Sequence, residues 1–151
     1  MAKAKSTLFL TGWKVVIIDD EEDSLNIASL LLEMSGAEVH TASNGKEGLA
    51  RIREVRPNFI ISDLSMPERD GWWLIQQING DRALAEIPCI ALTAHAMKGD
   101  RDRAIQAGFF NYLTKPLDPY KFMTQLLRLL VNVQEFSNTL RPELERLEAH
   151  G

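Results

Sequence analysis

Short apolar runs of the sequence repeatedly end in a side chain that can bind a cation, donate a hydrogen bond or carry charge. These side chains are, in chain order, Asp19 with Asp20, Asp63, Thr93 and Lys115. The run before Asp63, residues 59–62, is typical of a strand that an α/β domain buries on both faces. Its last side chain should therefore lie at the carboxyl edge of the sheet, where ligands bind. A carboxylate that only caps the following turn is the alternative for one isolated aspartate.

Three carboxylates that meet at one sheet edge would repel one another unless a cation lies among them. Ligands that are all oxygen atoms favour a hard divalent ion, and we predict Mg²⁺. The predicted ligands are Asp20, Asp63 and the backbone carbonyl of Ser65, with Asp19 orienting bound waters. Lys115 and Thr93 add an ammonium and a hydroxyl that can bond a phosphoryl group. The pattern therefore indicates phosphate chemistry at a carboxylate.

The composition bounds the class of protein. The chain has 151 residues, of which 45% are hydrophobic and 25% charged, and this fits one domain with a single core. The net charge is 17 − 21 = −4, and the scattered lysines and arginines do not form the basic stripe of a nucleic-acid binder. The lone Cys89 lies in an apolar run and cannot form an internal disulfide. We therefore expect a cytoplasmic domain with no direct nucleic-acid partner.

The amino terminus carries no predicted membrane segment. Lys3 and Lys5 are followed by only three apolar residues, 8–10, before Thr11 and Gly12. This stretch is far shorter than a signal peptide or a membrane span. We expect residues 1–12 to form a flexible tail.

The rest of the chain alternates strand patterns with helical patterns five times. The predicted strands are residues 15–18, 37–42, 59–63, 87–92 and 109–113. Gly36 and Gly108 are placed to end helices, and Asp118 with Pro119 is expected to begin the last helix as its N-cap and first-turn proline. This alternation predicts a parallel sheet with helices on both faces.

The sequence resembles the receiver domain of two-component response regulators. The motifs that carry the resemblance are Asp19-Asp20, Asp63 followed by Met66-Pro67 and Asp70-Gly71, Thr93-Ala94, and Lys115-Pro116. The resemblance covers roughly residues 13–134. It implies a flavodoxin-like (βα)₅ sandwich with strand order 2-1-3-4-5 and a site at the switch point between the first and third strands.

The resemblance also implies a role for each site residue. Asp63 would be the phosphorylated aspartate, Asp19 and Asp20 the acidic pair that holds Mg²⁺, and Lys115 the lysine that bonds the phosphoryl oxygens. Thr93 and Tyr112 would be the switch hydroxyl and the switch aromatic. The implied partners are a histidine kinase or histidine phosphotransfer protein and a downstream protein target. Such a protein phosphorylates and dephosphorylates itself, so no turnover of a separate substrate is expected.

Other classes fit less well or remain open. Phosphatases of the haloacid dehalogenase type show a second aspartate two residues after the nucleophile, where this chain has Ser65. A pseudo-receiver that only docks partners would not need the acidic pair, Asp63, Thr93 and Lys115 together. The chain contains no helix-turn-helix or catalytic domain, so we expect a stand-alone regulator; a receiver fragment of a larger hybrid kinase or regulator is the alternative.

The end of the chain, residues 135–151, is predicted to be a helical extension beyond the receiver. One apolar stripe at heptad-like spacing runs from the last receiver helix into this extension: Phe122, Leu126, Leu129, Val133, Phe136 and Leu140. A second stripe is Met123, Leu127 and Leu130, which either the folded-back tail or a second copy in a homodimer should cover. Pro142 predicts a break between Ser137 and Pro142. The expected output surface is formed by the fourth helix, the fifth strand and the last helix of the receiver, and the carboxyl-terminal extension is expected to take part in it.

Overall fold

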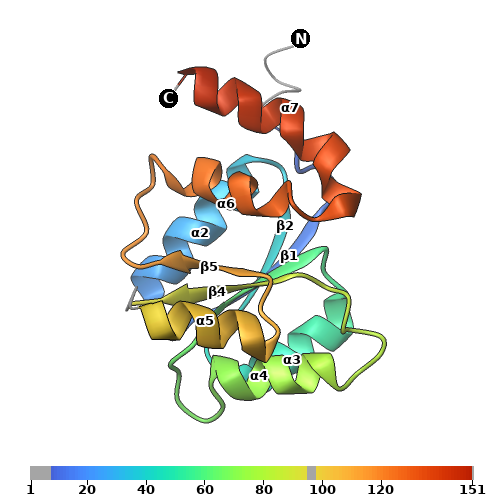
Figure 1. Ribbon diagram of the computed structural model, residues 1–151, viewed down its shortest axis with the longest axis vertical. Helices are drawn as coiled ribbons and strands as arrows, with labels where there is room; N and C mark the ends of the chain where they lie inside the picture. The colour runs from blue at the N-terminus through green and yellow to red at the C-terminus, as the bar shows by residue number, and fades with distance from the viewer. Residues whose placement is uncertain (1–7, 95–97, 151) are drawn as a thin grey trace.

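The computed structural model describes residues 8–94 and 98–150 of the chain. Its strands are β1 (Lys14–Ile18), β2 (Glu38–Ala42), β3 (Phe59–Asp63), β4 (Cys89–Thr93) and β5 (Asn111–Thr114). Its helices are α2 (Glu22–Met34), α3 (Gly45–Val55), α4 (Gly71–Asn79), α5 (Lys98–Ala107), α6 (Phe122–Leu130) and α7 (Gln134–His150). Figure 1 shows the helices arranged on both sides of one sheet.

The five strands form a parallel sheet in the order β2-β1-β3-β4-β5. This confirms the predicted flavodoxin-like topology. Ile18 pairs with Ser62, and Thr93 pairs with Thr114, so neighbouring strands end at nearly the same level. The residues that follow or end these strands are therefore brought to one edge.

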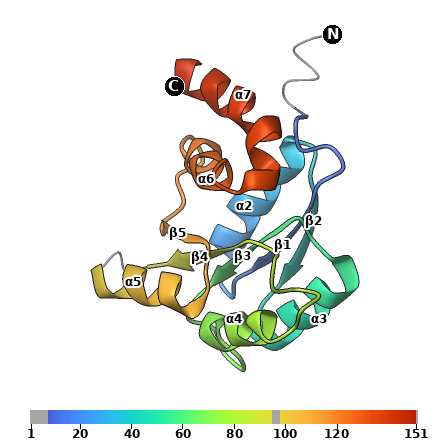
Figure 2. The same ribbon diagram turned by 45° about the vertical axis from the view of Figure 1, so that its right-hand side comes forward.

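Alternate residues of each central strand enter different halves of the core. Along β1, Val15 and Ile17 pack with residues of α2 and α6, whereas Val16 and Ile18 pack with residues of α3 and α4. Figures 1 and 2 show the same division, with α2 and α6 on one face of the sheet and α3, α4 and α5 on the other. Burial on both faces explains why these strands are continuous apolar runs.

Local capping sets several helix ends. The Asn44 side chain accepts a hydrogen bond from the backbone N–H of Glu47 at 2.8 Å at the start of α3. Gly36 follows α2 with φ of 98°, a left-handed conformation that glycine adopts without steric cost. The predicted helix stop at Gly36 therefore has its physical basis in the turn that leads to β2.

The expectation of a flexible tail through residue 12 is wrong for residues 8–12. Leu10 is fully buried, and its backbone N–H donates to the carbonyl of Ser35 at 2.8 Å. Trp13 packs against Phe136 of α7, with ring centroids 4.7 Å apart. The short apolar run 8–10 is too short to span a membrane, but it is long enough to bury one leucine in the core.

The start of the last receiver helix also differs from the prediction. α6 begins at Phe122, and Asp118 instead stabilises the turn before it. The Asp118 side chain accepts a hydrogen bond from the backbone N–H of Tyr120 at 2.9 Å. The backbone carbonyl of Asp118 accepts from the N–H groups of Lys121 and Phe122. Asp118 therefore caps a turn that precedes α6, and the N-cap position of the helix is occupied by Lys121. Strands β4 and β5 likewise begin two residues later than predicted.

The predicted break between Ser137 and Pro142 is wrong, because α7 is continuous from 134 to 150 and contains Pro142. The chain instead turns at residues 131–133, between α6 and α7. Phe136, Leu140 and Leu144 are all buried at a spacing of four residues, whereas Pro142 is exposed. Burial of that apolar face outweighs the backbone hydrogen bond that the proline cannot make.

Helix α7 packs outside α6, and both views show it as the outermost layer of the molecule (Figures 1 and 2). Leu127 and Leu130 are fully buried and Met123 is partly buried, in the same core cluster as Leu140 and Leu144. The second apolar stripe is thus covered within the chain, as the folded-back alternative predicts. None of the described helices has the length and apolar character needed to cross a bilayer.

Candidate functional site

The carboxyl edge of the sheet gathers side chains from four strands. Asp19 follows β1, Asp63 and Thr93 are the last residues of β3 and β4, and Lys115 follows β5. Here a pocket of about 260 Å³ opens to solvent. Its lining residues are Asp20, Glu21, Asp63, Leu64, Ser65, Thr93, Ala94 and Lys115. The structure therefore brings together all of the predicted site residues except Tyr112.

Lys115 lies at the centre of this arrangement. Its ammonium Nζ donates to Asp63 Oδ2 at 3.0 Å, to Asp19 Oδ1 at 3.1 Å and to Glu21 Oε1 at 2.6 Å. The Lys115 side chain is only 7% exposed. An ammonium has three donors, so each of its hydrogens has a carboxylate partner. The peptide bond from Lys115 to Pro116 is cis.

The pKa values of the pair reflect their surroundings. Burial alone would lower the pKa of Lys115, but its hydrogen bonds to Glu21, Asp19 and Asp63 outweigh that effect and raise the pKa above its usual value. Burial raises the pKa of Asp63, and the neighbouring charge of Asp19 adds to the rise against the opposing bond from Lys115. Lys115 is therefore firmly cationic, whereas the carboxylate of Asp63 is held at some electrostatic cost.

The acidic cluster fits a hard divalent cation. Asp19, Asp20 and Asp63 each offer a carboxylate oxygen, and these oxygens lie within 4.8 Å of one another. The buried Oδ2 of Asp19 accepts no hydrogen bond from the described residues, although it lies 3.0 Å from the Lys115 ammonium. Together with Glu21, the four carboxylates face one ammonium, a formal charge of 1 − 4 = −3. An all-oxygen donor set with excess negative charge suits Mg²⁺.

The loop after Asp63 is held close to the strand end. The backbone N–H of Ser65 donates to Asp63 Oδ1 at 3.4 Å, and that of Gly71 donates to the Leu64 carbonyl at 3.1 Å. A side chain at position 71 would collide with the carbonyl of Asp63. Asp70 caps α4 by accepting from the N–H of Trp73 at 2.9 Å. The Asp70-Gly71 pair thus lets α4 begin directly against the backbone of Asp63.

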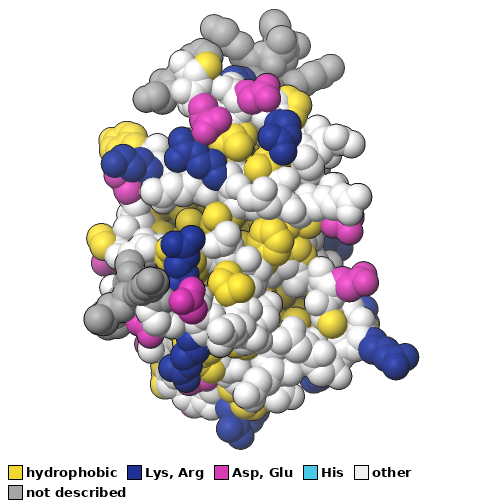
Figure 3. Space-filling view, viewed as in Figure 1, with side chains coloured by type: hydrophobic (Ala, Val, Ile, Leu, Met, Phe, Trp, Pro, Cys, Tyr) yellow, Lys and Arg dark blue, Asp and Glu magenta, His cyan; other side chains and the backbone are white. Residues whose placement is uncertain are grey.

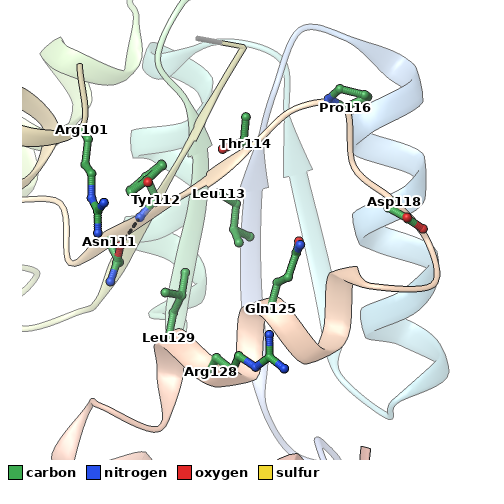
Figure 4. Close-up of a pocket in the computed structure, with 10 residues that line it drawn as sticks. All are labelled: Arg101, Asn111, Tyr112, Leu113, Thr114, Pro116, Asp118, Gln125, Arg128 and Leu129. Carbon is green, nitrogen blue, oxygen red and sulfur yellow. Dashed lines mark hydrogen bonds between the residues drawn. The ribbon is translucent and has the colours of Figure 1, made fainter. Parts of the chain in front are cut away.

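Thr93 and Tyr112 occupy different places. Thr93 is buried at the pocket, and its carbonyl accepts from the backbone N–H of Lys115 at 2.8 Å. Tyr112 lies on β5 two positions before Thr114 and lines a neighbouring pocket of about 370 Å³, where Arg101 stacks on its ring at 5.2 Å (Figure 4). His95, which the sequence places near Thr93, lies outside the described residues.

Sequence reasoning missed Glu21. The two adjacent aspartates define the predicted acidic pair, although the acidic run continues as Glu21, Glu22 and Asp23. The contact from Glu21 to Lys115 joins residues 94 positions apart, so it depends on the sheet topology and on a side-chain rotamer. The only signal in the sequence was the continuation of the acidic run past the predicted pair.

Comparisons with known proteins agree with this geometry. The family model of the response regulator receiver domain matches residues 15–127. The chain is 38% identical over 109 residues to the polar-differentiation response regulator DivK of Brucella anthropi, covering 72% of this chain and 89% of that protein. It is 37% identical over 134 residues to an uncharacterized 14.6 kDa protein of Leptolyngbya boryana, covering 89% and 97% of the two chains.

A solved structure shows the same fold. Chemotaxis response regulator CheY4 of Vibrio cholerae superposes with a TM-score of 0.74 at 29% identity, over 80% of this chain and 100% of that one. With its matched family model, its parallel sheet and its acidic pocket facing a lysine, the chain belongs to the response regulator receiver family and is a phosphoacceptor of two-component signalling.

Proposed function

We propose that Asp63 accepts the phosphoryl group, from a phosphohistidine on a histidine kinase or histidine phosphotransfer protein. The observation that carries this assignment is the position of Asp63 at the end of β3, with Lys115 bonded to its Oδ2 and Asp19 and Asp20 beside it. Of the three aspartates in the cluster, Asp63 is the one on the central strand that lines the open pocket and contacts the lysine with a single oxygen.

The transfer is a displacement at phosphorus. A carboxylate oxygen of Asp63 attacks, a new O–P bond forms, and the N–P bond of the phosphohistidine breaks with its electron pair remaining on the imidazole nitrogen. The Lys115 ammonium then donates to a phosphoryl oxygen, which neutralises part of the charge that the transfer brings into the pocket. Attack of water on the same phosphorus returns Asp63 to the free carboxylate. No separate substrate is turned over.

The acidic cluster supplies the remaining charge balance. Asp20, Asp63 and the backbone carbonyl of Ser65, with Asp19 behind them, would hold Mg²⁺, which neutralises the transferring oxygens when bound. Asp19 is buried and paired with Lys115, so it keeps the ammonium in line with Asp63. Thr93, at the rim of the same pocket, offers its hydroxyl to a second phosphoryl oxygen.

The output surface is the face formed by α5, β5 and α6. Phosphorylation draws Thr93 toward Asp63, and Tyr112 on the neighbouring strand adjusts with it, so that one of two conformations is favoured. Figure 4 shows Tyr112, Arg101 and Arg128 around a hollow on this face, next to the ends of the strands that carry the site. Basic side chains on the face shown in Figure 3 are scattered among acidic and apolar ones. A protein target therefore fits this surface better than nucleic acid.

The test is incubation with a small-molecule phosphodonor and Mg²⁺, followed by intact mass. We expect one phosphoryl adduct on the wild type and none on Asp63→Asn or after addition of a chelator. Asp102→Asn, on the exposed side of α5, is the matched control and should be phosphorylated like the wild type. An unmodified wild-type mass under saturating donor would refute the phosphoacceptor assignment, and an adduct retained on Asp63→Asn would move it to another residue.

A further inference from the structure

The Lys115 ammonium has no hydrogen left for a phosphoryl oxygen. Its three donors are used by Asp19, Asp63 and Glu21, and the bond to Glu21 is the shortest at 2.6 Å. Lys115 can donate to a phosphoryl group on Asp63 only if one of the three carboxylates gives up its hydrogen bond from the ammonium. The identity of the released carboxylate therefore matters for the reaction.

Burial decides which carboxylate is released at the lowest cost. The side chains of Asp19 and Asp63 are 0% and 8% exposed, so either one would lose a partner with little access to water. The side chain of Glu21 is 62% exposed, and water can solvate its carboxylate as soon as the ion pair opens. Glu21 is thus the carboxylate that Lys115 can exchange for a phosphoryl oxygen at the lowest cost.

The backbone of Glu21 is fixed while its side chain is otherwise uncommitted. Its N–H donates to Asp19 Oδ1 at 2.9 Å, which anchors the residue beside the acidic pair. Glu21 is also the N-cap residue of α2, a position where a side chain usually accepts a backbone N–H. Among the described residues it makes no such capping bond, and its carboxylate is directed to Lys115 instead.

We propose that Glu21 is a positioning residue that occupies Lys115 in the unphosphorylated protein and yields it to the incoming phosphoryl group. Glu21 thereby restrains phosphorylation in two ways: it competes for the ammonium, and it adds a negative charge beside a group that arrives as an anion. The inference rests on the proposed role of Asp63. Under this proposal, Glu21 helps to set the rate at which Asp63 is phosphorylated.

The experiment measures the second-order rate constant for phosphorylation of the full chain by acetyl phosphate with Mg²⁺. Glu21→Gln should react faster than the wild type by about 3- to 10-fold, the effect of removing one nearby charge in partly solvated surroundings. Glu22→Gln is the matched control, because it removes the same charge from the next exposed residue; its rate should stay within about twofold of the wild type.

Two further variants separate contact from charge. Glu21→Asp keeps the charge but shortens the side chain by one methylene, so it should lose the contact with Lys115 and recover part of the rate gain of Glu21→Gln. In a Lys115→Ala background, Glu21→Gln should raise the rate by less than it does in the presence of Lys115, because only the effect of the removed charge remains. Circular dichroism of each variant checks that the fold is retained.

The outcomes are distinct. A wild type that takes up no phosphoryl group refutes the proposed function itself. A wild type that is phosphorylated, with equal rates for Glu21→Gln and Glu22→Gln, or with Glu21→Gln slower than the wild type, overturns the role of Glu21 alone. A rate gain that is as large without Lys115 as with it would also overturn it.

Discussion

The residues of the site are arranged for reaction and at a cost to stability. Asp63 is 6% exposed and Asp19 is 1% exposed, and the two share one ammonium. Buried like charges destabilise a fold unless a cation compensates them, and the excess here remains after Lys115 is counted. The free protein therefore holds an unfavourable charge cluster that binding of Mg²⁺ would relieve.

This electrostatic cost predicts how stability should depend on Asp63 and on pH. Burial, with the charge of Asp19, raises the pKa of Asp63, so the folded protein accepts a proton there more readily than the unfolded chain does. Asp63→Asn should therefore raise the free energy of unfolding at pH 7 by on the order of 1 kcal/mol in the absence of divalent ions. The advantage should shrink as the pH falls through the raised pKa, because protonation then neutralises the wild type as well.

Urea unfolding at pH 7 and at pH 5 checks this. The matched control is Asp102→Asn, whose exposed carboxyl should leave the difference from wild type near zero at both pH values. An advantage of Asp63→Asn that grows toward low pH would show that its carboxyl is stabilised in the folded state, contrary to the expectation.

At the scale of elements, the sequence predicts what local patterns determine. Every strand was placed within two residues because a strand buried on both faces must be a continuous apolar run, and Gly36 marked a true helix end. The predictions fail where contacts between residues far apart in the sequence determine the local structure. Leu10 is held by a hydrogen bond to the end of α2 and by burial in the core, not by its sequence neighbours. Helix α7 continues through Pro142 because three of its apolar side chains pack into the same core cluster.

The site was predictable to the same extent. Four of the site residues end a strand or follow one directly, so parallel topology alone brings them together: Asp19, Asp63, Thr93 and Lys115. The partner of Lys115 at Glu21 could not be predicted, because acids at several neighbouring positions could reach the ammonium and side-chain geometry selects among them.

Pro142 gives a prediction at this scale. It lies in the middle of α7 and is exposed, so it costs a backbone hydrogen bond without filling the core. Pro142→Ala should raise the free energy of unfolding by about 1–3 kcal/mol, measured by the urea midpoint and by helicity at 222 nm. Exposed Glu145→Ala, in the same helix, should change stability by less than about 0.5 kcal/mol. A loss of stability in Pro142→Ala would mean that the proline shapes α7 to fit its neighbours.

At the scale of the whole molecule, α7 determines which surface the receiver presents. The helix is held mainly by apolar burial, because Phe136, Leu140 and Leu144 enter the core shared by α2 and α6. The Arg128–Glu148 ion pair at 2.9 Å joins α6 to α7, but its side chains are 58% and 41% exposed, and such solvent-exposed pairs contribute little. Arg128 also lines the hollow on the α5–β5–α6 face, so α7 lies at the border of the proposed output surface.

The last prediction concerns association. Burial of Phe136, Leu140 and Leu144 contributes on the order of 4–8 kcal/mol, a large part of the stability of a domain. The full chain should be a monomer by light scattering with and without phosphodonor, because Leu127 and Leu130 are already buried in the core cluster that contains Leu140 of α7. A chain that ends at residue 133 should have a lower urea midpoint and should associate, since the freed surface is apolar. Phosphorylation-dependent dimers of the full chain would show instead that α7 leaves α6 on activation. A truncated chain that is monomeric and as stable as the full chain would show that α7 is not needed to cover the apolar surface of α6.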